Sequence, residues 1–539
     1  MGEAYSRRDS PRVNNSAALK SLGRKGEPLS CVLESAIERS LERFALSLLA
    51  LRLLTGLLLL PPWAGFDEPY HQGYVEVSAE SLGWPSFRGI ALPDRLVDEM
   101  RRWPLPPRYA AIFSARTYGQ DQSPPIHAFH DTNYETQQSP LYYAAAGLVL
   151  RPLSRPRPIL ELYVLRLLNA GVAFGVGVLL VKTARRLDLS WIPVALLAFM
   201  PGFGVAMCRV SNDALCALLI SAAVAGALAS DSRCWGPTIG SAAAGLAPWA
   251  KLYGLAVLPG SVYREATRRD SPAGHRWMRV LLITAPAIAL AFFSFKILGH
   301  AVPIMYNIRG APSASLFDIP WIRTAWTVAK THIWISGMSF LVFPTWLYLV
   351  PLAFLSWGLW LTIVSVRSGK AETSKIVALT APLLLFAIAL GYQEWRGFSY
   401  YGGPGGSGGW YLWAVALPEM LLLTYGAGRQ GMIRSWTIPV LASLLVLTVL
   451  GDLALFCDAA GILASTPNGH IQGVIAAPLS RVVADYAESR PTGAAVASVG
   501  LSVISWCVAL VFLIRVNKAS RSAPPLDDAH FIAVPRETS

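Results

Sequence analysis

The sequence carries little charge for its length. Only 15% of its 539 residues are Asp, Glu, Lys or Arg, and 53% are hydrophobic, whereas a soluble domain has about 25% charged residues. Apolar runs recur from Leu46 onward and are too long and continuous for the strands of a barrel. Because a lipid-exposed backbone must satisfy its own hydrogen bonds, the sequence predicts an all-α polytopic membrane protein.

Cysteine pairs and nucleotide-binding motifs are also missing. The six cysteines are scattered singly, so neither a disulfide framework nor a zinc site is implied. No GxxxxGK-Ser/Thr phosphate loop occurs, and no expected cytosolic segment is large enough to bind ATP or a nucleotide sugar. Any reaction would therefore use an activated substrate that is already in the membrane. The net charge of +13 does not indicate nucleic-acid binding, because most Lys and Arg lie in short loops, as a topology signal does.

The apolar runs predict about twelve spans. We expect residues 1–43 to be a basic cytosolic tail with an interfacial lead-in, 44–515 to be the transmembrane domain, and 516–539 to be a cytosolic tail. The expected spans are 44–62 (an uncleaved first helix), 160–181, 191–207, 212–230, 237–250, 252–264, 280–298, 341–366, 376–392, 410–426, 436–456 and 494–515. With this topology every clearly basic short loop falls on one side, which predicts a multi-pass protein of the cell membrane with both termini cytosolic.

The stretch 64–158 contains no full span and is expected to be the first extracytoplasmic loop. Its apolar run 140–150 would cover only about 16 Å as a helix, which is half a bilayer. We therefore expect a re-entrant or interfacial helix there.

Two adjacent acids and a histidine follow the first span: Asp67, Glu68 and His71. One interpretation is a general base beside an orienting or metal-binding carboxylate at the membrane surface, with a nearby imidazole. The alternative is a solvated acidic turn, in which His71 is an ordinary polar surface residue.

A second polar group leads into the short apolar run. Glu135 and Gln138 precede Tyr142 and Tyr143. They would line a site that faces both water and lipid, or they would cap an interfacial helix with an ordinary aromatic belt.

Four further residues are candidates for binding a ligand. Asn212 and Asp213 open a span, where an acid at a helix N-terminus is favourable without any ligand. Lys251 lies between two short apolar helices, where it either snorkels or meets an anion such as a lipid phosphate. Arg396, beside a Gly-rich loop, would bind the same anion.

These residues together resemble a known family. The motifs, in chain order, are Asp67-Glu68-Pro69-x-His71, Glu135-x-x-Gln138-x-Pro140-Leu141-Tyr142-Tyr143, Ser211-Asn212-Asp213-Ala214-Leu215 and Lys251-Leu252. They resemble the GT-C superfamily of membrane glycosyltransferases over roughly residues 44–265, in particular bacterial relatives of the protein-mannosyltransferase and aminoarabinose-transferase group.

The resemblance implies a polyprenyl-phosphate sugar donor in the outer leaflet and transfer to a hydroxyl of a glycan, lipid or protein acceptor in the cell envelope. Asp67 matches the family's base, with Glu68 beside it, and Lys251 matches a contact to the donor phosphate. The sequence departs from the family at Gly409-Trp410-Tyr411, where many relatives have Gly-Arg-Tyr. No cofactor is implied with certainty, and a divalent metal stays open because family members differ in metal use.

The alternative function is a transporter or flippase of a lipid-linked glycan. Transporters commonly show internal repeats and broken helices near the membrane midplane. This sequence shows no evident repeat, and its polar groups lie at the expected outer surface.

In the transferase reaction, base-catalysed attack opposite the leaving phosphate would invert the configuration of the sugar carbon.

Overall fold

The computed structural model describes most of the chain: residues 29–65, 67–81, 91–103, 133–153, 157–229, 235–268, 271–297, 315–336, 341–369, 373–401, 408–429, 432–466 and 470–522. The predicted tail 1–27, the end of the C-terminal tail and the glycine-rich residues 402–407 lie outside this part.

The described part is almost entirely helical, with one short antiparallel hairpin. Its elements are α2 (Leu29–Leu59), α3 (Glu68–Ser81), α4 (Asp94–Arg102), η2 (Tyr134–Gln137), α6 (Leu141–Leu150), η3 (Arg151–Leu153), α7 (Pro158–Arg186), α8 (Ile192–Phe199), α9 (Pro201–Cys208), α10 (Asp213–Ala227), α11 (Trp235–Ala250), η4 (Leu252–Val257), α12 (Leu258–Thr267), α13 (Ala273–Ile297), η5 (Leu316–Asp318), α14 (Trp321–Ile333), α15 (Trp346–Arg367), α16 (Thr373–Tyr401), η6 (Gly409–Val415), α17 (Ala416–Arg429), α18 (Ile433–Ala459), β1 (Leu463–Ser465), β2 (Ile471–Val474), α19 (Leu479–Glu488) and α20 (Thr492–Ser522).

Several helices are long and apolar enough to cross a membrane, which makes this a multi-pass membrane protein. Within the described residues they are five: Pro158–Arg186, Trp346–Arg367, Lys375–Phe398, Ser435–Ala459 and Thr492–Ser520. The pair α9 and α10, bent by 114°, brings the number to six if it is one span. The predicted number of twelve is not shown, since several expected spans are divided into shorter helices. Residues 191–207, for example, form α8 and α9, which meet at Met200-Pro201, where proline lacks the amide hydrogen that would continue the helix.

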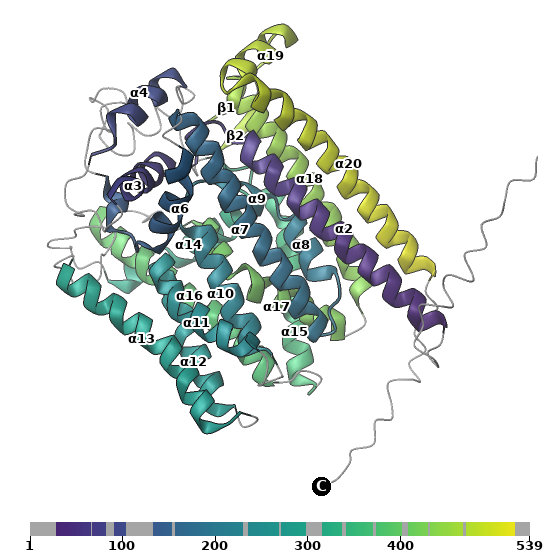
Figure 1. Ribbon diagram of the computed structural model, residues 1–539. Coiled ribbons are helices and arrows are strands. Elements are labelled where there is room, and N and C mark those ends of the chain that lie inside the picture. Colours follow the sequence, from purple (N-terminus) through teal and green to yellow (C-terminus); the bar gives the residue numbers. More distant parts are fainter. Residues whose placement is uncertain are drawn as a thin grey trace, which may run out of the picture.

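The short apolar run has the predicted length. It forms α6, a helix of 10 residues, which is too short to cross a bilayer. Figure 1 shows α6 beside α3 at one end of the molecule, with α4 nearby. The sequence therefore predicted both the existence and the length of this element.

Long helices from both ends of the chain lie side by side. Figure 1 shows α2, α18 and α20 as neighbours. A buried ion pair joins them: Arg52 of α2 donates to Asp452 of α18 over 2.5 Å, and Trp506 of α20 donates to the same carboxylate over 2.8 Å. A charged group inside an apolar helix is tolerated only with such partners.

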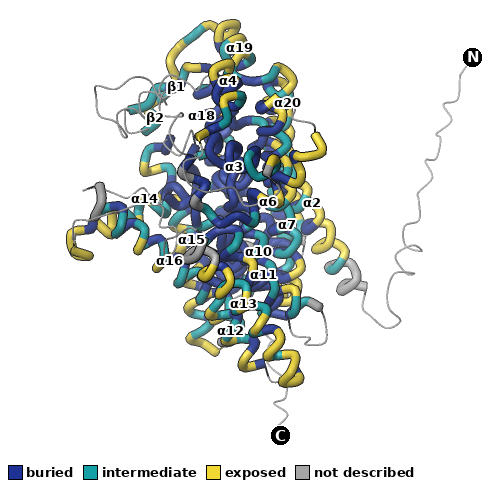
Figure 2. The backbone as a smooth tube through the Cα atoms, turned by 60° about the vertical axis from the view of Figure 1, so that its left-hand side comes forward, coloured by how far each residue is buried: buried dark blue, intermediate teal, exposed yellow. Residues whose placement is uncertain are grey.

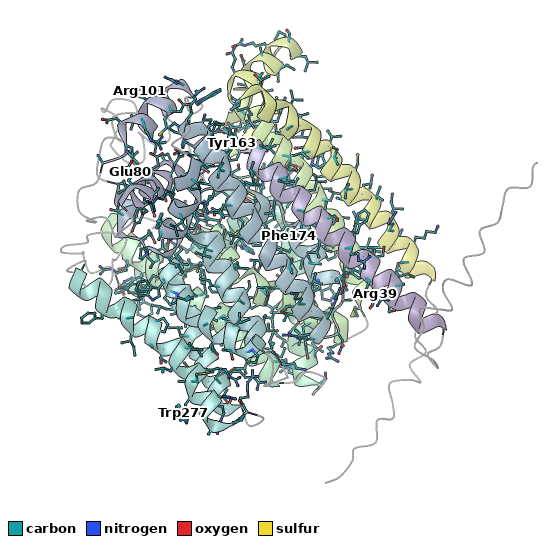
Figure 3. The ribbon with its side chains drawn as sticks, viewed as in Figure 1. Arg39, Glu80, Arg101, Tyr163, Phe174 and Trp277 are labelled. Atoms are coloured by element: carbon teal, nitrogen blue, oxygen red, sulfur yellow. The ribbon has the colours of Figure 1, made fainter. Side chains whose placement is uncertain are left out.

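The core lies along the middle of the helix bundle. Figure 2 shows buried residues through the inner helices, with exposed residues at both ends and on the outer faces. In Figure 3, Glu80 and Arg101 lie at the end that holds α3 and α4, whereas Arg39 and Trp277 lie toward the other end. Exposed apolar side chains on α13, such as Trp277 and Ile288, are what a lipid-facing helix presents.

Candidate functional site

The two acids after α2 have different environments. Asp67 is partly exposed and has a left-handed backbone (φ 61°), which is uncommon outside glycine. Glu68 is wholly buried. Its carboxylate accepts bonds from Arg166 Nε (2.8 Å) and Nη2 (2.6 Å) and from the amides of Val210 (3.0 Å) and Gly65 (3.2 Å). The geometry thus leaves Asp67 as the acid of this pair with access to water.

Arg166 holds this turn together. It is fully buried in α7, and besides Glu68 it donates to the carbonyls of Leu57 (3.3 Å), Leu60 (2.7 Å) and Pro61 (2.8 Å). Leu57 lies in the last turn of α2, and Leu60 and Pro61 directly follow the helix, where backbone carbonyls lack helical partners. Sequence reasoning missed Arg166, although a charged residue inside an expected span is itself a signal of a functional or buried partner.

His71, Tyr143 and Glu135 form a buried polar group beside this turn. His71 Nδ1 lies 2.8 Å from the Tyr143 hydroxyl, which lies 3.3 Å from Glu135 Oε2. Burial, followed by the negative charge of Asp67, raises the pKa of Glu135 to about 8. Burial, followed by the positive charge of Lys251, lowers the pKa of His71 well below its usual value. Both shifts favour the uncharged form of these side chains.

A second group is ionic and carries a surplus positive charge. Asp213 accepts a bond from Lys251 Nζ (2.5 Å) and one from Arg209 (2.9 Å), and all three residues are buried. Two cations share one carboxylate. The ammonium of Lys251 also lies 5.0 Å from the ring centre of Tyr411 and 5.7 Å from that of Tyr253, within the range of cation–π attraction.

The two groups share one region of the molecule. The charges of Asp67, Lys251 and Asp213 all act on Glu135, and the carboxylate of Asp67 is within electrostatic range of Tyr411. Residues from the turn before α3, from η2, α6, α10 and η6 thus converge. Such convergence of titratable groups is typical of functional sites.

Three more predicted residues lie at this site. Asn212 donates to the carbonyl of Ala250 (3.0 Å) and lies 3.5 Å from Gln138 Oε1. Its own Oδ1 is buried, without a hydrogen-bond partner among the described residues. Tyr142 is buried and packs edge-on against Tyr143, with ring centres 5.3 Å apart.

Arg396 is not joined to this site by any contact within the described part of the chain. It is half-buried in α16. One turn earlier, Gln393 accepts a hydrogen bond from Tyr253, which neighbours Lys251. The helix is therefore adjacent to the ionic group, while the predicted phosphate contact of Arg396 itself stays a prediction.

No residue set in the described ranges brings together three or more His, Cys, Asp or Glu side chains that could hold a metal ion. Metal use therefore stays open, as it was from the sequence.

These observations describe a helical, multi-pass membrane protein whose polar site joins acids, an imidazole and a cationic pair. Among solved structures the chain is similar to the crystal structure of ArnT from Cupriavidus metallidurans bound to undecaprenyl phosphate. The match covers 88% of this chain and 77% of that chain, at 16% sequence identity and a TM-score of 0.42. No family model and no curated protein matches the chain.

Proposed function

We propose that the chain is a glycosyltransferase that moves a sugar from a polyprenyl-phosphate donor to an acceptor hydroxyl on the extracytoplasmic face of the membrane. The observation that carries the proposal is the pairing of a partly exposed acid with a cationic group of net positive charge in one site. An acid and a phosphate-binding cation are the two groups that this transfer needs.

The donor phosphate would bind at Lys251 and Arg209. Asp213 offsets one of the two cations and leaves one positive charge. A fixed cation stabilises the negative charge that develops as the bond between the sugar carbon and the phosphate oxygen breaks. The product polyprenyl phosphate leaves with that electron pair.

The acceptor would be activated by Asp67. The carboxylate takes the hydroxyl proton while the acceptor oxygen forms the new bond to the sugar carbon, on the face opposite the leaving phosphate, so the product has inverted configuration. Glu68 has another role in this scheme. Its oxygens are occupied by Arg166 and two backbone amides, so it holds the turn that presents Asp67.

The uncharged group would face the sugar. Tyr143 and Glu135 offer hydroxyl and carboxyl groups that can bond sugar hydroxyls. Asn212 offers a buried acceptor that has no partner in the described part of the chain. A site built from such groups selects strongly for substrates that satisfy them.

The test is an Asp67→Asn variant in membranes supplied with a panel of polyprenyl-phosphate sugars. Asp188→Asn is a matched control, because Asp188 also has a left-handed backbone (φ 56°) and its side chain is 82% exposed. We expect Asp67→Asn to lower the transfer rate by about 10²–10⁴-fold and the control to retain it. Full transfer by Asp67→Asn would remove Asp67 from the mechanism. Glycan movement across vesicles without transfer by any form would favour a transporter.

A further inference from the structure

Another buried polar group, which has no part in the proposed chemistry, lies where α14 ends. His332 Nδ1 lies 3.1 Å from the carbonyl oxygen of Gly409, and its Nε2 lies 2.7 Å from Glu419 Oε1. The imidazole is buried against Trp413, with ring centres 4.0 Å apart. Next to it, Thr331 accepts a hydrogen bond of 2.7 Å from the Gly409 amide.

These contacts hold both ends of η6. Gly409 is the first residue of η6, and Glu419 lies in the first turn of α17, which directly follows η6. The imidazole of His332 therefore joins the start of this seven-residue element to the first turn of the helix that follows it.

Gly409 shows how closely α14 approaches η6. A Cβ atom at Gly409 would lie 2.0 Å from the carbonyl oxygen of Val328 and 2.2 Å from the amide nitrogen of His332. No side chain fits there, so the backbone of η6 rests directly on α14.

Between the two held ends lies Tyr411. Its ring centre is 5.0 Å from the ammonium of Lys251 and 5.5 Å from the ring centre of Tyr253. Any shift of η6 moves this ring relative to the cation that we assign to the donor phosphate.

The protons of the bridge follow from its partners. A carbonyl oxygen can only accept, so Nδ1 of His332 carries a hydrogen. The contact between Nε2 and Glu419 then needs one further proton, held by either atom. A glutamine at 419 can supply that donor through its amide, whereas an alanine cannot.

We propose that His332 is a positioning residue that clamps η6 and thereby fixes Tyr411 against Lys251. This inference rests on the proposed function only in its claim that the held surface serves the donor phosphate. His332 touches no reacting atom in the scheme and acts through η6.

The experiment separates the two bonds of the imidazole. In His332→Asn the side-chain amide nitrogen occupies the position of Nδ1 and can still donate to the Gly409 carbonyl. In His332→Gln the amide nitrogen occupies the position of Nε2 and can still donate to Glu419. His332→Ala removes both bonds. Glu419→Gln and Glu419→Ala form the matching pair on the other side, and His275→Ala, at an exposed histidine of α13, is the control.

Two readouts are measured on purified full-length protein: amide hydrogen exchange of residues 408–416, and the dissociation constant of undecaprenyl phosphate. We expect His332→Ala to speed exchange in this segment and to weaken binding about tenfold, which corresponds to about 1.4 kcal/mol. Glu419→Gln should bind more tightly than Glu419→Ala, and each His332 replacement that keeps one bond should fall between His332→Ala and the wild type.

The outcomes are distinct. Unchanged exchange in His332→Ala would overturn the clamp. Faster exchange with unchanged binding would show that the clamp serves stability alone and would overturn the positioning role. If the wild type binds no undecaprenyl phosphate while exchange still rises in His332→Ala, the proposed function fails and the assigned role toward the donor fails with it, although His332 is shown to hold η6.

Discussion

Glu68 and Asp67 are neighbours in the sequence, yet the structure predicts opposite results for their amides. Replacing Glu68 by Gln removes one charge of an ion pair whose two side chains are both 0% exposed. The guanidinium of Arg166 then stays charged in a buried place. Each oxygen of Glu68 accepts two of the four hydrogen bonds, so two donors would face an amide NH₂ group. Breaking one side of such a pair costs about 3–5 kcal/mol.

Asp67→Asn should cost far less stability. Its side chain is partly exposed, and asparagine is among the few residues that accept a left-handed backbone. Substitutions of this kind usually change the free energy of unfolding by less than about 0.5 kcal/mol.

The assay is equilibrium unfolding in mixed micelles, followed by tryptophan fluorescence, for Glu68→Gln, Arg166→Met and the double variant. Residues in direct contact show coupling of about 0.5–3 kcal/mol, so the double variant should lose less than the sum of the single losses. It should still be less stable than the wild type, because the carbonyls of Leu57, Leu60 and Pro61 lose their donor. A Glu68→Gln protein as stable as the wild type would refute the structural role. If that stable protein also failed to transfer sugar, Glu68 would have a role in catalysis.

Three further predictions address the remaining groups. Burial raises the pKa of Glu135 from 4.5 to about 8, so its contribution to stability is present below pH 4.5 and is lost as pH rises through 8. The free energy of unfolding should therefore fall less between pH 5 and pH 8 in Glu135→Gln than in the wild type. Lys251→Met should weaken undecaprenyl phosphate binding about 10- to 100-fold, as loss of a charged hydrogen bond does, and a titration with this lipid checks it. Gly409→Ala should lower the unfolding temperature, since its Cβ would lie 2.0 Å from the Val328 carbonyl oxygen and overpacking costs about 1–3 kcal/mol. A thermal melt compared with the wild type measures the effect, and an unchanged unfolding temperature would contradict it.

Elements governed by local rules could be predicted from the sequence. The apolar run 140–150 is bounded by proline and arginine, and its length alone gave the short helix α6. The span predicted at 191–207 is instead two helices of eight residues each. Hydropathy is averaged over such a stretch, so it does not show the break in the helix at Pro201.

The membership of the site was also predictable, but the roles of its members were not. Nine of the ten predicted positions, all except Arg396, lie in or beside the polar region, since each belongs to a motif at the end of an apolar segment. The different roles of Asp67 and Glu68 depend on Arg166, which is 98 residues away from Glu68. No spacing rule connects these positions, because the contact is made by packing of α7 against the end of α2. The interpretation of Asp213 as a simple helix cap was likewise incomplete, because its carboxylate holds two cations from other positions.

Arg209 supplies the second cation that the segment Gly409-Trp410-Tyr411 lacks. With Lys251 alone, Asp213 would cancel the only positive charge of the group, and nothing would remain to attract a phosphate. Arg209 reaches the other carboxylate oxygen at 2.9 Å, so the surplus charge depends on both cations equally. Arg209→Gln should therefore weaken undecaprenyl phosphate binding as strongly as Lys251→Met, while Arg367→Gln, at an exposed arginine near the end of α15, should leave it unchanged. If Arg209→Gln binds like the wild type, the charge of Lys251 alone suffices and the surplus-charge argument is wrong.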